Sequence, residues 1–215
     1  MGHKVNPVGF RIGITQTWKS KWFGKKEYKD NLKQDIGIRT EVMKKWKAAF
    51  IADVEIERSQ AAIRIIIRTA RPGVLIGRGG SGVEDIKKHI MDNFFRGKRV
   101  NLRIDIQEVK SMEESAMIMA QNVTEQIEKR MPFRRILKST IEQAMKNGLI
   151  KGVKVEMSGR LGGAEMSRRE WLSKGTLPLH TLRANIDFAK ATANTTYGAI
   201  GVKVWLYKGD VFEKK

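Results

Sequence analysis

The chain has 215 residues, with 42 Lys and Arg against 23 Asp and Glu, so its formal net charge at pH 7 is +19. Hydrophobic residues form 41% of it, enough for one or two cores, and the surplus positive charge indicates a polyanionic partner, with nucleic acid the leading candidate. Cysteine is absent and three histidines are scattered, which excludes disulfide frameworks and thiolate metal sites and disfavours a clustered metal site.

Residues 1–16 interleave Pro7, Gly9 and Gly13 with Lys4 and Arg11, a pattern that predicts an irregular basic arm rather than a helix. The arm lacks the apolar core of a secretory signal, and nowhere does the chain reach the roughly 18 consecutive apolar residues that span a bilayer. The sequence therefore predicts a cytoplasmic protein whose arm can lie along a surface.

Residues 28–50 are rich in helix formers, with a break expected at Gly37. Two runs of alternating polarity follow at 53–57 and 63–68, with a hairpin expected at Ser59 and Gln60 between them. The outward side chains are acidic in the first run and basic in the second. We therefore expect ion pairs across the strands, which argues against this face as the main contact with a polyanion.

A glycine cluster follows the short apolar run at 74–76, with the sequence Gly77-Arg78-Gly79-Gly80-Ser81-Gly82. It matches the G-x-G-x-x-G pattern of dinucleotide sites, but the full strand that should precede that motif is missing, and no Gly-Lys-Ser/Thr follows as in a P-loop. As a G-x-x-G turn between two helices it has the surroundings of a KH module, whose glycines let phosphates approach the main chain. A solvated helix-to-helix turn is the alternative.

A helix is predicted from 83 to Gly97, and a strand over 100–107. The order in residues 17–110 is then helix, strand, strand, helix, helix, strand. Residues 1–110 contain 24 basic and 12 acidic residues, and 111–215 contain 18 and 11. Because both parts are basic, neither is typical of a neutral catalytic domain with a basic appendage.

Residues 111–208 begin with two predicted helices, at 113–130 and, after the break at Pro132, up to 147. Three strands and a short helix are expected next: the strands at 153–158, 182–188 and 200–207, the helix near 165–173. Two helices over a mostly antiparallel sheet make a two-layer α+β domain, and 209–215 form a short tail.

Four cationic residues lie near or on the second helix, opposite its apolar face: Arg130, Arg134, Arg135 and Lys138. No acidic residue lies between Glu128 and Glu142, so ion pairs one turn apart cannot neutralise this stretch. Phosphate contact and an ordinary solvated helix face both remain open.

A further set combines a glycine-rich loop with cations: Arg160, Gly162, Gly163, Arg168, Arg169, Lys174, His180 and Arg183. The planar fork of arginine suits phosphates and base edges. A lone His180 is more typical of a structural hydrogen bond than of a general base, and no nucleophile, base and orienting residue come together, so no enzyme is expected. Three tryptophans are expected in cores, and two could stack on bases: Trp46, Trp171 and Trp205, then Trp18 and Trp22.

Six separated motifs carry a resemblance: GHKVNP with GFRIG at 2–13, TARPG at 69–73, RMPFRR at 130–135, SGRLGGAE at 158–165, PLHTLRA at 178–184 and GVKVW at 201–205. By these the chain resembles the universal third protein of the small ribosomal subunit, in its bacterial form. The resemblance implies an N-terminal type II KH domain (αββααβ) and a C-terminal α+β domain, without a cofactor. It also implies a place in the head of the subunit near small-subunit ribosomal proteins ten and fourteen.

Three groups of RNA contacts follow from the motifs and the resemblance. The KH loop consists of Gly77, Arg78, Gly79 and Gly80. The messenger RNA entry channel, where a basic helix assists unwinding, contains Arg130, Arg134, Arg135 and Lys138. The residues expected to contact ribosomal RNA are His3, Lys4, Arg11, Arg160, Gly162, Gly163, Arg168, Arg169, His180 and Arg183. We expect a structural constituent of the small subunit that binds its RNA and grips messenger RNA. The alternative is a free-standing KH-domain RNA chaperone or ribosome-assembly factor, which would wash off mature subunits in high salt.

Overall fold

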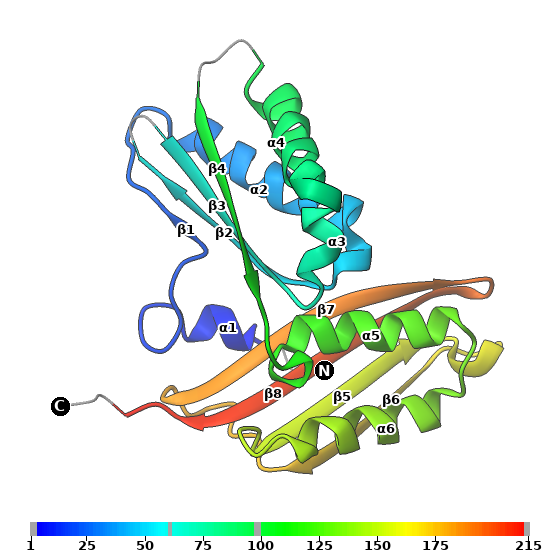
Figure 1. Cartoon of the computed structure of the whole chain (residues 1–215). Helices are drawn as coiled ribbons and strands as arrows, with labels where there is room; N and C mark the ends of the chain where they lie inside the picture. The colour runs from blue at the N-terminus through cyan, green and yellow to red at the C-terminus, as the bar shows by residue number, and fades with distance from the viewer. Residues whose placement is uncertain (1–3, 60–61, 97–99, 213–215) are drawn as a thin grey trace. The chain divides into compact units, whose positions relative to one another are not determined.

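The computed structural model describes residues 4–59, 62–96 and 100–212, which divide into two compact units (Figure 1). One unit is Trp18–Lys110, and the other joins the described residues of 1–17 to those of 111–215. In the described ranges no helix is long and apolar enough to cross a membrane.

The unit of Trp18–Lys110 is a four-stranded sheet in the order β1-β2-β3-β4, packed against helices. Its strands are β1 Ser20–Lys21, β2 Ile51–Arg58, β3 Ala62–Thr69 and β4 Asn101–Glu108; its helices are α2 Tyr28–Lys45, α3 Pro72–Ile76 and α4 Ser81–Phe94. β2 and β3 are antiparallel, whereas β1–β2 and β3–β4 are parallel. One core joins Ile38 of α2 and Ile86 of α4 to Ile65 of β3. The predicted αββααβ order is confirmed, with β1 as an unpredicted addition at the edge.

The break expected at Gly37 is wrong, because α2 runs through it without interruption. A Cβ atom at this position would lie 2.4 Å from Cε1 of Phe94, so glycine here lets α2 approach α4 closely. The α4 helix ends at Phe94, and the expected end at Gly97 lies outside the described residues, as does Gln60 of the expected hairpin.

The predicted ion pairs across β2 and β3 are confirmed. Arg68 lies 2.6 Å from Glu55, and Arg64 lies 3.5 Å from Glu57. Lys21 of β1 reaches both glutamates, at 3.0 and 3.3 Å. This face of the sheet therefore neutralises much of its own charge.

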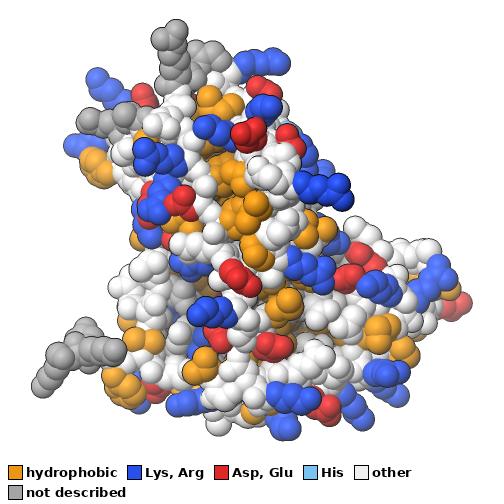
Figure 2. Space-filling model, viewed as in Figure 1, with side chains coloured by type: hydrophobic (Ala, Val, Ile, Leu, Met, Phe, Trp, Pro, Cys, Tyr) orange, Lys and Arg blue, Asp and Glu red, His pale blue; other side chains and the backbone are white. Residues whose placement is uncertain are grey.

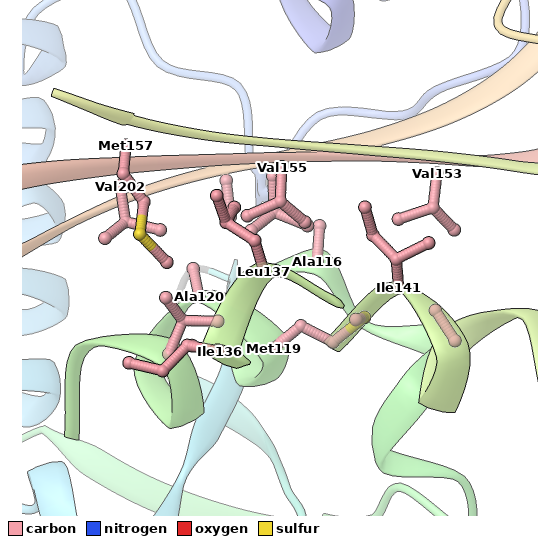
Figure 3. Close-up of a cluster of buried hydrophobic side chains, with 14 of the residues drawn as sticks. Ala116, Met119, Ala120, Ile136, Leu137, Ile141, Val153, Val155, Met157 and Val202 are labelled. Atoms are coloured by element: carbon pink, nitrogen blue, oxygen red, sulfur yellow. The ribbon is translucent and has the colours of Figure 1, made fainter. Parts of the chain in front are cut away.

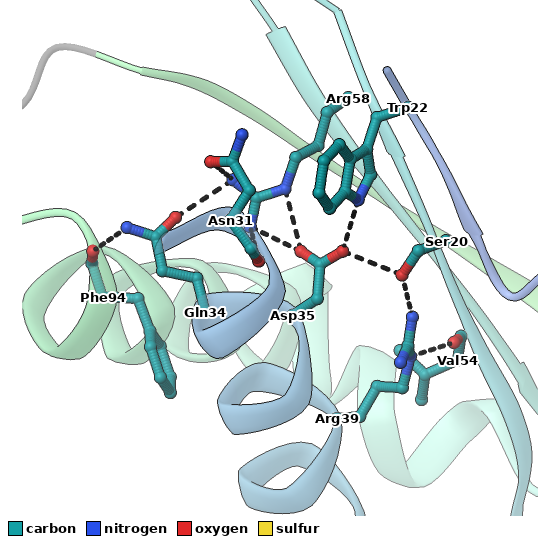
Figure 4. Close-up of polar contacts among 9 residues, drawn as sticks. All are labelled: Ser20, Trp22, Asn31, Gln34, Asp35, Arg39, Val54, Arg58 and Phe94. Atoms are coloured by element: carbon teal, nitrogen blue, oxygen red, sulfur yellow. Dashed lines mark hydrogen bonds and ion pairs between the residues drawn. The ribbon is translucent and has the colours of Figure 1, made fainter. Parts of the chain in front are cut away.

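A buried polar network fixes β1 and the segment after it to the rest of the unit (Figure 4). Asp35 of α2, with no exposed surface, accepts hydrogen bonds from the Ser20 hydroxyl and from the Trp22 indole N–H, each at 2.8 Å. Arg58 of β2 donates to the same carboxylate. Trp22 thus has a structural role, and the base stacking suggested for it and for the exposed Trp18 stays a prediction.

The second unit has an antiparallel sheet in the order β6-β5-β8-β7, with α5 and α6 over one face (Figure 1). The helices are α5 Ala116–Glu128 and α6 Phe133–Lys146; the strands are β5 Gly152–Gly159, β6 Arg168–Gly175, β7 Ala184–Thr195 and β8 Gly198–Asp210. In the core between them, Leu137 and Ile141 of α6 point toward Val153 and Val155 of β5 (Figure 3). The two-layer α+β prediction is confirmed.

The short helix expected near 165–173 is wrong, since this segment forms β6 at the edge of the sheet. Almost every side chain of β6 is exposed, so the sequence carries no alternating pattern that could reveal a strand. Hydrogen bonding to the β5 backbone decides its conformation instead.

The N-terminal arm belongs to this second unit. It contains a single helical turn, α1 Pro7–Phe10, which the Asn6 side chain caps by accepting from the amides of Val8 and Gly9. Arg11 follows it and is fully buried against β7 and the segment before it. The expected irregular arm is therefore partly helical and is anchored to the C-terminal sheet.

Candidate nucleic-acid interface

The glycine loop joins α3 to α4 with a backbone that only small residues adopt readily. Gly77, Gly79 and Gly80 all have positive φ angles, of 68°, 61° and 85°. Arg78 lies between them, is exposed and forms no ion pair with any described residue. Gly80 caps α4 without a side-chain hydrogen bond, which leaves amides of the first turn of α4 available to an anion. The loop is shaped for close approach of a phosphate.

Gly82 explains why the loop also matched a dinucleotide pattern. A Cβ atom there would lie 2.3 Å from the carbonyl oxygen of Leu75, so the glycine serves the close contact between α3 and α4. The loop leads from one helix into another rather than from a parallel strand into a helix. The geometry thus favours the KH reading over a dinucleotide site.

Apolar surface lies beside this loop. Ile104 and Ile106 of β4 are half-buried, and Val74 and Ile76 of α3 are exposed. Figure 2 shows hydrophobic side chains in a strip over this part of the unit, with Lys and Arg and some Asp and Glu side chains along its margins. A surface that combines an apolar strip with cations can take bases on the strip and phosphates at its margin.

The α6 helix separates an apolar face from a cationic one. Ile136 and Ile141 are buried in the core, whereas Arg134, Arg135 and Lys138 are exposed. Arg130 precedes the helix in a left-handed turn, with φ 61°, and is also exposed. No described residue supplies a carboxylate to any of these four cations.

Two cationic groups that are separate in the sequence meet around Phe133. The guanidinium of Arg134 lies 5.6 Å from the centre of its ring, and that of Arg168 on β6 lies 5.2 Å from it. A cleft of about 440 Å³ extends beside them, lined by Arg130, Phe133, Arg160, Gly162, Gly163 and Tyr197 among others. We call this surface, from Arg130 to Lys138 with Arg160 and Arg168, the arginine surface.

Hydrogen bonds to backbone carbonyl groups hold in place the loop at 160–164, which forms one side of the arginine surface. Arg160 donates hydrogen bonds to the carbonyl oxygens of Ala164, at 2.9 Å, and Tyr197, at 3.4 Å. Gly162 and Gly163 have positive φ angles, and a Cβ atom at Gly163 would lie 3.2 Å from Cε2 of the Tyr197 ring. Arg160 is therefore partly occupied in holding the loop.

The remaining predicted contacts lie elsewhere. Arg169 points to the other face of the sheet, where it and Lys4 approach Glu156 at 2.6 and 3.9 Å. Arg183 pairs with Asp210 at 3.1 Å, and His180 is exposed in the segment before β7. His3 lies outside the described residues.

The prediction that Arg11 contacts ribosomal RNA is wrong, because its side chain is fully buried and cannot reach RNA. Its guanidinium donates to the carbonyl oxygens of Ala184 at 2.8 Å, and of Pro7, Leu179 and Thr181 at 2.9 Å each. Burial lowers the pKa of Arg11 from its ordinary value. The residue holds the arm to the sheet.

Phe133 and Tyr197 are the residues of the cleft that sequence reasoning missed as functional candidates. Phe133 lies at the margin of the core, half-buried, and two guanidinium groups lie near its ring. Tyr197 could have been recognised from the sequence, because an aromatic residue beside Gly198 at the tip of a hairpin is not expected to belong to a core. In the described ranges, no group of three or more His, Asp or Glu side chains is placed to hold a metal ion.

Known families match the two units. The KH domain family matches residues 37–114, and the family described as "Ribosomal protein S3, C-terminal domain" matches residues 123–206. Proteins named small ribosomal subunit protein uS3 from Clostridium botulinum and an Exiguobacterium species are 52% and 49% identical, over 100% of this chain and 96% of each relative. The protein of that name from Desulfosudis oleivorans is 51% identical over 99% of this chain and 97% of its own. The matches cover nearly all of this chain and nearly all of each relative, and the glycine loop has the geometry of a KH loop. The chain therefore belongs to the uS3 family of small ribosomal subunit proteins.

Proposed function

We propose that this protein, a structural constituent of the small ribosomal subunit and not an enzyme, binds the RNA of that subunit and lines the messenger RNA entry channel. In this role the arginine surface grips messenger RNA and assists its unwinding. The observation that carries the proposal is the exposed row of Arg134, Arg135 and Lys138, to which no described residue offers a carboxylate.

Electrostatics supports the assignment of the row to a nucleic acid. Cations that lack local partners gain most from a polyanion, because each phosphate they neutralise releases condensed counterions. The nearby rings of Phe133 and Tyr197 add flat surfaces on which an unpaired base can stack. Single-stranded RNA, rather than a stable RNA duplex, can contact the cations with its phosphates and the rings with its unpaired bases.

The KH loop and the cations outside the arginine surface are proposed to hold ribosomal RNA. The loop offers backbone amides and Arg78, while Lys4, Arg169 and Arg183 are exposed in part and keep donors available. The family resemblance extends this proposal to a place in the head of the subunit, beside small-subunit ribosomal proteins ten and fourteen, in the bacterial cytoplasm.

The test is translation by ribosomes that carry the triple variant Arg134→Ala, Arg135→Ala and Lys138→Ala. We expect a greater slowing on messenger RNA with a stable hairpin than on an unstructured one of equal length. Lys146→Ala is the control, because Lys146 is an exposed cation in the last turn of the same helix. Equal slowing on both messengers, with normal incorporation of the variant into subunits, would reject the unwinding role.

A further inference from the structure

The C-terminal sheet has a second face, turned away from α5 and α6. Strand register places Trp171, Glu156, Lys203 and Lys190 side by side across the four strands. The row two residues along consists of Ser173, Lys154, Trp205 and Phe188. Side chains two residues apart share a face, and the row between them, with Val155, Val204 and Ala189, is buried under the helices. We call these two outer rows the second sheet face.

Aromatic rings and cations alternate closely on this face. The Lys154 ammonium lies 4.6 Å from the ring centre of Trp171 and 5.4 Å from that of Trp205. Phe188 packs against Trp205 at 5.1 Å, and the Lys190 ammonium lies 5.7 Å from the Phe188 ring. Trp205 is buried as predicted, but Trp171, also expected in a core, is 55% exposed. A tryptophan at the edge of a sheet thus presents its indole to solvent.

The charge of this face is positive and incompletely balanced. Glu156 is the one carboxylate in the two rows, and it is already engaged by Arg169 at 2.6 Å and Lys203 at 3.3 Å. Lys154 and Lys190 have no ion pair with a described residue. Burial, reinforced by the nearby charge of Lys4, lowers the pKa of Lys154, as expected for a cation among cations. An added anion would relieve this repulsion.

We propose that the second sheet face is an additional binding site for single-stranded RNA, with a base stacked on Trp171 and phosphates held by Lys203 and Lys190. Arg169, two residues before Trp171 on the same face of β6, holds a further phosphate. The charge argues for this occupant, because a polyanion complements cations that outnumber the single carboxylate. The exposed indole argues for RNA over an acidic peptide, since every base offers a flat face to an aromatic ring. The site is independent of the arginine surface, which lies on α6 and the cleft beside it.

The experiment uses the full chain with the KH loop weakened by Gly79→Asp and the arginine surface weakened by alanine at 134, 135 and 138. The probe is a fluorescently labelled decauridylate. We expect Trp171→Ala to weaken its binding about tenfold and Trp171→Phe, which keeps a ring, to weaken it much less. Met166→Ala is the control, since Met166 is 82% exposed in the same unit but lies outside the two rows. An unchanged affinity in Trp171→Ala would overturn the proposal.

A second measurement keeps the test sharp if Trp171→Ala folds poorly. Photo-crosslinking of the same chain with an oligonucleotide that carries 5-iodouridine, followed by mass spectrometry, is expected to label Trp171. Labels confined to other segments would overturn the site. A decaglutamate peptide that binds as tightly as the RNA, with the same dependence on Trp171, would assign the face to a protein partner and reject RNA. None of these outcomes depends on the translation assay proposed for the arginine surface.

Discussion

Arg58 donates two hydrogen bonds to one oxygen of the Asp35 carboxylate, from Nε at 2.8 Å and from Nη2 at 2.5 Å. The other oxygen accepts from Ser20 and Trp22. Asp35 is fully buried and Arg58 nearly so, hence this pair depends on complete hydrogen bonding to offset the loss of hydration. It links α2 to β2 and to β1 in one network.

We predict that Asp35→Ala lowers the free energy of unfolding by about 3–5 kcal/mol, because it leaves the Arg58 charge buried without a partner. Urea unfolding of the full chain, followed by circular dichroism, measures the loss. Asp85→Ala is the control, since Asp85 is exposed and has no ion pair in the described part of the chain. Losses of similar size in the two variants would contradict a special role for the buried pair.

The KH loop allows a test that separates charge from shape. At Gly79, with φ 61°, a Cβ atom would meet nothing within 4 Å, and both Asn and Asp tolerate this left-handed conformation. We predict that Gly79→Asp weakens binding to a fragment of small-subunit RNA several-fold, whereas Gly79→Asn binds nearly as well as the unmodified chain. Filter binding at two salt concentrations measures the difference, which should shrink at high salt. Equal effects of Asp and Asn would point to shape alone.

Glu156 predicts a pH dependence of stability. Burial alone would raise its pKa, but the hydrogen bond from Arg169 and the charge of Lys203 outweigh it and hold the pKa of this carboxyl below its ordinary value. A lowered pKa in the folded state contributes stability that is complete above the unfolded pKa, about 4.3, and is lost as the pH falls through the folded value.

We therefore expect Glu156→Gln to be less stable than the unmodified chain at pH 7, by about 1.5–3 kcal/mol, with the gap closing in acid. Thermal unfolding between pH 7 and pH 3 provides the measurement. Glu142→Gln is the control, because Glu142 is exposed on α6. A gap that stays constant down to pH 3 would show that the carboxylate charge is not the cause.

The periodicity of the sequence predicted most of the fold, since apolar residues alternate in β2, β3 and β4 and recur at helical spacing in α4, α5 and α6. The errors arose where a partner distant in sequence decides the outcome. The ring of Phe94 leaves room only for glycine at position 37, and pairing with the β5 backbone makes Arg168–Gly175 a strand. Neither partner can be read from the local pattern.

The candidate site shows the same limit. Counting charge identified Arg134, Arg135 and Lys138, which are exposed, but it also selected Arg11, whose side chain is buried among carbonyl groups. The second sheet face was missed because its rows assemble from four strands, each of which contributes a single residue to each row. Only the register of the strands brings Trp171 beside Lys154.

The anchoring of Arg11 has a consequence for biosynthesis. Arg11 leaves the peptide exit tunnel well before its acceptor on Ala184, which lies 173 positions later in the chain. The contiguous segment Trp18–Lys110 can acquire its structure while translation continues, whereas the unit that holds both chain ends must wait until nearly all of it has been synthesised. A truncated nascent polypeptide would thus possess a finished KH domain and an unclosed C-terminal sheet.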